Sequence, residues 1–125
     1  MKVFRSLPHA ESRRPCALTI GNFDGVHLGH QTLLRELKKK ASAENHALVV
    51  ITFNPHPRKI LQSHAERFLL GSYIQRRKWL ADAGVDHLIE IPFTRDFSTL
   101  GAAAFLDGHV LAYKNIKSIF LGWDF

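Results

Sequence analysis

The chain has a single cysteine, Cys16, and this excludes a disulfide within it. It does not open on a basic segment followed by a long apolar stretch. Its longest clean apolar run, Ala47–Phe53, is far shorter than the roughly 20 residues that cross a bilayer. No internal repeat or low-complexity segment is visible. We therefore expect a protein of the reducing cytoplasm with no membrane span.

The composition is that of an ordinary globular domain. The 125 residues are 46% hydrophobic and 22% charged, which excludes a disordered or fibrous chain and suits a single domain. A formal charge of +6 favours anionic partners, either polyanions or phosphorylated small molecules. The basic clusters Lys38–Lys40 and Arg76–Lys78 fall on expected helices and are not interleaved with aromatic residues. We interpret both as solvated helix faces and expect no nucleic-acid partner.

Alternating apolar runs and helical patterns predict the order β-α-β-α-β-α-β, hence an α/β fold with a parallel sheet, helices on both faces and right-handed crossovers. The expected strands are 16–20, 48–53, 85–91 and 118–121, and the expected helices run from about 28 to 44, 74 to 83 and 99 to 112. An edge strand is expected around Val3 and Phe4. The second helix carries Ile74, Trp79 and Leu80 with basic residues between them.

The segment Gly21–His30 lies between the first of these strands and a helix. Its glycines let the backbone approach a ligand closely, and His27 and His30 fall on one side of the helix's first turn. Amide groups at a helix start favour an anion, so the segment is typical of a phosphate site. The histidine pair could instead be ordinary surface residues or two metal ligands. No Cys or carboxylate cluster completes such a metal site, and we expect no metal ligand.

Three segments follow strands of the expected sheet, namely Gly21–His30, Asn54–Pro57 and Gly122–Phe125. Ligands of open α/β sheets bind beyond the carboxyl ends of the strands. We therefore expect these segments to meet on one rim, where two substrates could bind together.

These segments resemble a known family. Gly21–Gln31 is similar to the first motif of the bacterial bifunctional riboflavin kinase/FMN adenylyltransferases, also called prokaryotic FAD synthetases. Thr52–Pro57 resembles that family's second motif, Ala83–Asp86 its usual helix-to-strand turn, and Ile119–Phe125 the strand entering its third motif. The resemblance covers residues 1–125 as the amino-terminal adenylyltransferase module.

The resemblance implies a Rossmann-like nucleotidyltransferase of the His-x-Gly-His type, which transfers AMP from ATP to FMN and yields FAD and pyrophosphate with Mg²⁺. His27 and His30 would be catalytic, binding the ATP phosphates and stabilising the pentacoordinate α-phosphorus. The implied substrate-binding residues are Gly21, Asn22, Phe23, Asp24, Gly25, Gly29, Phe53, Asn54, Pro55, His56, Pro57, Gly122 and Asp124. The implied partners are ATP and FMN, with neither nucleic acid nor membrane.

Simpler roles remain open for three of these residues. His56 could be a loop residue between two prolines, Asp24 could cap the helix, and Asp124 could belong to a frayed end. Trp123 departs from the small or acidic residue that the family's third motif would have.

The family's module would continue with a basic, glycine-containing segment, a Ser/Thr/Arg-rich motif and a β-barrel kinase domain, and none of these follows Phe125. We therefore expect a fold incomplete at its C-terminus, with the missing part on a separate chain as one hypothesis and no riboflavin kinase activity. A nucleotide- or flavin-binding remnant without catalysis is the alternative function. Transfer to another phosphorylated acceptor is a third hypothesis, which the Asn54–Pro57 loop disfavours.

Overall fold

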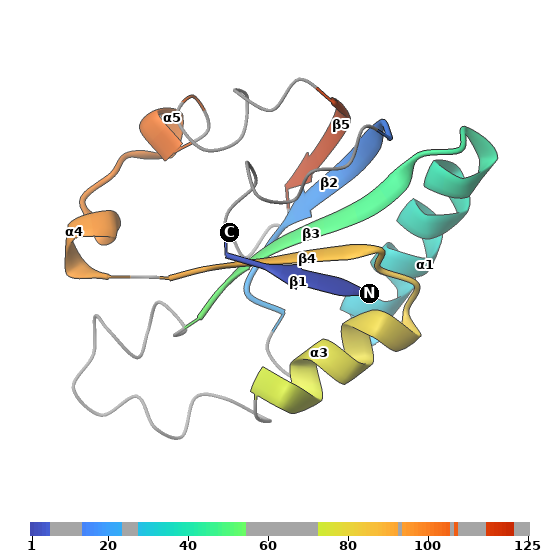
Figure 1. The fold of residues 1–125 in the computed structure, drawn as a ribbon, viewed down its shortest axis with the longest axis horizontal. Helices are drawn as coiled ribbons and strands as arrows, with labels where there is room; N and C mark the ends of the chain where they lie inside the picture. Colours follow the sequence, from blue (N-terminus) through green and yellow to red (C-terminus); the bar gives the residue numbers. More distant parts are fainter. Residues whose placement is uncertain are drawn as a thin grey trace.

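A single parallel sheet forms the centre of the molecule (Figure 1). The computed structural model describes residues 1–5, 14–23, 28–54, 73–92, 94–105, 107 and 115–121. The strands are β1 (Lys2–Phe4), β2 (Cys16–Ile20), β3 (Ala47–Phe53), β4 (His87–Ile91) and β5 (Ile116–Leu121). The helices are α1 (Leu28–Ala43), α3 (Tyr73–Asp82), α4 (Arg95–Ser98) and α5 (Ala102–Phe105). The strand order is β1-β4-β3-β2-β5, and every neighbouring pair is parallel.

The central strands β2 and β3 are buried along their whole length. Both are short apolar runs with β-branched residues, which suit a parallel strand covered on both faces. Their register pairs Leu18 with Val49 and Ile20 with Ile51. Burial also raises the pKa of the Cys16 thiol to about 11, so this thiol stays protonated at neutral pH.

Two hydrophobic layers lie on opposite faces of the sheet. Helices α1 and α3 cover one face, and α4 and α5 lie on the other side (Figure 1). The layer under α1 and α3 consists of Phe23, Leu34, Leu37, Leu48, Val50, Leu80, Val85 and Leu88. The opposite layer consists of Cys16, Leu18, Ile20, Ala47, Val49, Ile51, Phe53, Ile89, Ile91 and Phe105. Successive side chains along a strand therefore point alternately into the two layers.

The strand order reverses beside β2. From β2 the chain proceeds outward to β3 and β4, and it then returns to place β5 on the other side of β2. In doubly wound sheets such a reversal opens a crevice at the carboxyl ends of the two diverging strands. The loop that begins at Gly21 lies at this reversal because it directly follows β2.

The sheet, its direction and the helices on both faces confirm the predicted α/β fold. The edge strand and the first two helices lie within one residue of their predicted positions, and the last strand begins two residues earlier. The strand predicted from Val85 begins later, at His87, because Val85 N–H still closes the helix by donating to the Leu80 carbonyl at 3.2 Å.

The predicted start of the helix from 99 to 112 is wrong, because a short helix that was not predicted, α4, ends at Ser98 and α5 begins only at Ala102. Thr99 ends α4, because its N–H and its hydroxyl both donate to the Asp96 carbonyl. The chain then turns, and the Gly101 carbonyl accepts the first hydrogen bond of α5 from Phe105 N–H at 3.0 Å. The residues 106 and 108–114 lie outside the described part of the chain.

Ile74 does not join the core, although it is one of the apolar residues of α3. Its side chain is 78% exposed, whereas Leu80 is fully buried and Trp79 packs partly against the core. The buried positions of α3 are Arg76 and Leu80, four residues apart on one face. The contacts of α3 with the sheet therefore include a charged residue.

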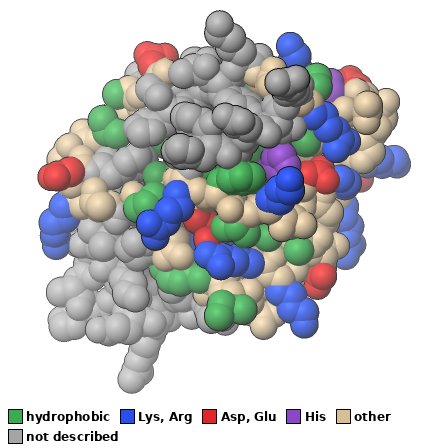
Figure 2. All heavy atoms as spheres, viewed as in Figure 1, with side chains coloured by type: hydrophobic (Ala, Val, Ile, Leu, Met, Phe, Trp, Pro, Cys, Tyr) green, Lys and Arg blue, Asp and Glu red, His purple; other side chains and the backbone are tan. Residues whose placement is uncertain are grey.

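Basic side chains lie at several separate places on the face seen in Figure 2, with acidic side chains among them. Within the ranges that the structure describes, none of the helices is both long and apolar enough to cross a membrane.

Asp86 links α1 to the sheet just before β4. One of its carboxylate oxygens, Oδ2, accepts hydrogen bonds from Leu48 N–H at 2.8 Å and from Lys38 Nζ at 3.0 Å. Partial burial opposes ionisation of Asp86, but these two donors outweigh it and hold the pKa of the carboxyl below its usual value. Gly84, at φ 95°, makes the tight turn between α3 and Asp86 and packs against the Lys38 stem.

Replacing Asp86 with Asn should lower the free energy of unfolding by about 1–3 kcal/mol at neutral pH, since a charged acceptor with two donors is lost. Because the folded pKa is the lower one, this contribution is complete above the ordinary value of 3.8 and disappears as the pH falls through the folded pKa. Urea unfolding of both proteins between pH 3 and pH 7 measures it. Asp82→Asn, at an exposed position of α3, should change stability by less than about 0.5 kcal/mol throughout.

Candidate functional site

The loop after β2 makes a tight turn over the carboxyl end of the sheet. Gly21 N–H donates to the Ile51 carbonyl at 3.1 Å, which keeps the loop beside β3. Phe23 then adopts φ 54°, a left-handed conformation that is unfavourable for a bulky side chain. A Cβ atom on Gly21 would lie 3.0 Å from Cε2 of Phe23. Gly21 is therefore the residue that allows the Phe23 ring to fold back over the turn.

His30 lies in the first turn of α1 and packs against the same ring. Its side chain is only 7% exposed, and its ring centroid lies 5.0 Å from that of Phe23 at an interplanar angle of 57°. The Phe23 ring is itself part of the core layer under α1. The orientation of His30 is consequently determined by the core as well as by the helix.

The backbone carbonyl of Asn22 is held by two donors. It accepts hydrogen bonds from Thr52 Oγ1 at 3.1 Å and from Arg76 Nη1 at 3.2 Å. The side-chain oxygen Oδ1 of Asn22 is buried and accepts no hydrogen bond from the described residues. The backbone of Asn22 is thus anchored by two hydrogen bonds. Its side-chain oxygen Oδ1 is a buried acceptor within the candidate site.

The loop after β3 starts next to the first loop. Asn54 N–H donates to the Ile91 carbonyl at 3.1 Å, and the Phe53 carbonyl accepts a hydrogen bond from Arg76 Nη2 at 3.0 Å. The structure therefore brings together the start of the first motif and the start of the second, as the sequence predicts.

Seven of the fifteen predicted site residues lie in the described part of the chain. Six predicted residues lie at the carboxyl ends of β2 and β3 or in the first turn of α1, namely Gly21, Asn22, Phe23, His30, Phe53 and Asn54. Gly29 is exposed in that same turn. The predicted residues that lie outside the described part of the chain are Asp24, Gly25, His27, Pro55, His56, Pro57, Gly122 and Asp124.

The interpretation of Arg76–Lys78 as a solvated basic face is wrong for Arg76. Arg76 is 4% exposed, and its Nη2 lies 3.3 Å from Oε2 of Glu90, which is 5% exposed. Arg77 also binds Glu90, donating from Nε to Oε1 at 2.9 Å, and this hydrogen bond raises the pKa of Arg77. The Arg77 side chain is still 42% exposed, and Lys78 is exposed as expected.

Sequence reasoning missed Thr52, Arg76 and Glu90 as site residues. A signal was present, because Glu90 is the only carboxylate in the otherwise apolar stretch Leu88–Ile91. A carboxylate buried in a strand requires a cationic partner, and a basic helix precedes that strand in the chain.

The chain is similar to known proteins of one family. The model of the family described as FAD synthetase matches residues 9–125. The chain belongs to the FAD synthetase family. It is 34% identical to the bifunctional riboflavin kinase/FMN adenylyltransferase of Escherichia coli (strain K12) over all of this chain and 41% of that protein. It is 40% identical to the FAD synthetase of Listeria monocytogenes over 94% of this chain and 47% of that protein. The chain thus spans less than half the length of these relatives.

A solved structure shows that the fold is shared as well. The crystal structure titled as a macrolide-efflux protein from Streptococcus pneumoniae superposes with a TM-score of 0.81 at 30% sequence identity. The match covers 98% of this chain and 41% of that one. The described sheet and helices are therefore an arrangement already observed in a larger protein.

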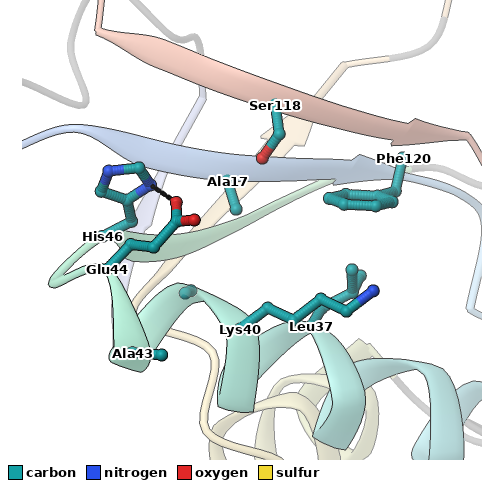
Figure 3. Close-up of a pocket in the computed structure, with 9 residues that line it drawn as sticks. Ala17, Leu37, Lys40, Ala43, Glu44, His46, Ser118 and Phe120 are labelled. Atoms are coloured by element: carbon teal, nitrogen blue, oxygen red, sulfur yellow. Dashed lines mark ion pairs between the residues drawn. The ribbon is translucent and has the colours of Figure 1, made fainter.

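A cavity of about 240 Å³ lies away from the family's motif residues. It lies between α1 and the strands β2 and β5, with Leu37 and Lys40 on the helix side and Ser118 and Phe120 on β5 (Figure 3). His46, which precedes β3, marks its position toward the amino ends of the strands. The candidate site lies at the opposite ends of the same strands.

Among the described residues, no cluster of His, Cys, Asp and Glu side chains could hold a metal ion.

Replacing Gly21 with Ala should destabilise the protein by about 1–3 kcal/mol, because the new methyl group overpacks the buried Phe23 ring. The matched control is Gly101→Ala, since nothing lies within 4 Å of a Cβ at that position. It should change the free energy of unfolding by less than about 0.5 kcal/mol. Urea unfolding measures both, and equal effects of the two substitutions would contradict the packing of Phe23 on Gly21.

Proposed function

We propose that this chain carries the adenylyltransferase site of the FAD synthetase family and transfers AMP from ATP to FMN. The observation that carries the proposal is the placement of His30, buried in the first turn of α1 where the strand order reverses. Crevices at such reversals bind nucleotides, and the exposed amides of a helix start favour phosphate. Membership of the FAD synthetase family supports this choice of reaction.

In the proposed reaction an oxygen of the FMN phosphate attacks the α-phosphorus of ATP. The new P–O bond forms as the bond from the α-phosphorus to the bridging oxygen breaks, and pyrophosphate leaves with that electron pair. The FMN phosphate is ionised at neutral pH, so no general base is required. Such transfers depend on positioning and on stabilisation of the developing charge. Mg²⁺ would enter with ATP and neutralise part of the phosphate charge.

His30 would donate a hydrogen bond to the phosphate oxygens as negative charge develops, together with His27. Asn22 and Asp24 would orient phosphate or ribose groups. The segment Phe53–Pro57 would shape the rim at which FMN binds, and Gly122 and Asp124 would line the nucleotide side. Residues 1–125 would form the adenylyltransferase domain in this proposal, acting in the cytoplasm, where ATP and FMN are available. The riboflavin kinase activity in the relatives' names is not part of it.

The direct test incubates the purified chain with FMN, ATP and Mg²⁺ and measures FAD by chromatography and pyrophosphate by a coupled assay. Equal amounts of both products are expected. Absence of FAD, under conditions in which the E. coli relative produces it, would reject the activity for this chain. Calorimetric binding of ATP or FMN without turnover would then favour the remnant hypothesis.

His30→Leu should lower kcat/KM by at least about 100-fold, because one donor to the developing charge is lost while most of the buried volume is kept. The matched control is His46→Leu, at a half-buried position at the amino end of β3. It should retain activity within about threefold. Circular dichroism confirms that both variants are folded, and a His30→Leu variant with normal turnover would reject the proposed role.

A further inference from the structure

One buried side chain contacts the loop after β2 and the end of β3, where the second loop of the proposed site begins. Arg76 projects from α3 to the carboxyl ends of the strands, where Nη1 binds the Asn22 carbonyl and Nη2 binds the Phe53 carbonyl. Asn22 belongs to the loop after β2, and Phe53 is the last residue of β3. The two loops are therefore joined through one planar guanidinium group as well as through the sheet.

Glu90 keeps this guanidinium in place. Glu90 is the neighbour of Thr52 in the β3–β4 register, and its carboxylate lies under α3, within reach of both arginines. On the other side, the Tyr73 ring lies with its centroid 4.8 Å from Cζ of Arg76. A buried cation is stable only when it is paired and hydrogen-bonded, and both conditions are met here.

The contact with Asn22 acts on a strained part of the backbone. The carbonyl that Arg76 binds belongs to the peptide bond between Asn22 and Phe23. Rotation of this peptide changes φ of Phe23, which has the left-handed value of 54°. Such a conformation persists only where the surroundings determine it. Thr52 and Arg76 together hold the peptide in the orientation that sets the Phe23 ring against His30.

We propose that Arg76 is a positioning residue, which holds the two loops in register so that His30 and the backbone of the first loop meet the ATP phosphates, with Glu90 as its counter-ion. The proposal rests on the adenylyltransferase function proposed above. Arginine is required because its donors diverge in one plane toward three acceptors. A lysine ammonium is a single point and cannot span them.

The test compares Arg76→Lys with Arg35→Lys, the same exchange at an exposed position of α1. Arg76→Lys keeps the charge beside Glu90 but loses the simultaneous contacts with both loops. We expect kcat for FAD formation to fall about 10- to 100-fold while KM for ATP changes less than about threefold, because misplacement of reacting groups mainly affects the transition state. Arg35→Lys should leave both constants unchanged.

A measurement independent of turnover accompanies the kinetics. Amide hydrogen exchange of Gly21 and Asn54, whose N–H groups bond to Ile51 and Ile91, should be at least about fivefold faster in Arg76→Lys than in the wild-type chain. The central strand amides should remain protected, which also shows that the variant is folded. Arg35→Lys should leave all of these rates unchanged.

Two results would overturn the positioning role: a wild-type kcat in Arg76→Lys, or unchanged exchange at Gly21 and Asn54. If the wild-type chain forms no FAD, the adenylyltransferase proposal fails, but the exchange rates still decide whether Arg76 holds the loops. An equal loss of protection at every amide would indicate general destabilisation, which also rejects the specific role.

Discussion

The arrangement of the loops depends on the hydrogen bonds and the ion pair that the Arg76 guanidinium group makes. The central strands are buried on both faces, so they offer ligand-binding groups only where they end. At those ends the backbone leaves the sheet, and its carbonyl groups need new donors. Arg76 supplies donors to two of these carbonyls while Glu90 compensates its charge. One ion pair therefore stabilises the end of the core and shapes the start of the site.

The packing around Phe23 has a similar double role. The ring belongs to the core layer under α1, yet it also contacts His30 in the first turn of that helix. Gly21 leaves room for the ring, and the left-handed backbone of Phe23 directs it inward. A histidine whose orientation is determined by packing needs little reorganisation when a ligand binds. Stabilisation of a developing charge requires a group that is preorganised in this way.

Much of the fold follows from local sequence pattern. The runs that became β2 and β3 are almost entirely apolar and include β-branched residues, so their state depends little on their neighbours. The long helix α1 has a clear apolar stripe, in which Leu34, Leu37 and Ala41 are buried. The sequence pattern predicted the short helices α4 and α5 least well. Thr99, where the third helix was expected to begin, instead ends the unpredicted helix α4, and α5 begins only after Gly101.

The candidate site was predictable to the extent that it lies in contiguous motifs. The glycines and histidines of the first motif follow a strand, and parallel strands place all such loops at one edge, so their proximity could be inferred from the sequence. For Arg76 the sequence held only an indirect signal: Glu90 in an apolar strand indicates a cationic partner, but a charged helical residue is ordinarily solvated and no local pattern selects Arg76 from the basic helix. Arg76 is buried because the crossover from β3 to β4 lays α3 over Glu90.

The sequence by itself determined the order of the elements, the parallel sheet and the position of the glycine-rich turn, since each depends on residue types close together in the chain. Only the tertiary structure decided which polar groups became buried partners. Arg76, Glu90 and the carbonyl of Asn22 lie in three different segments, and a hydrogen-bonded cluster of this kind forms only when the folded sheet brings those segments within a few ångströms of one another.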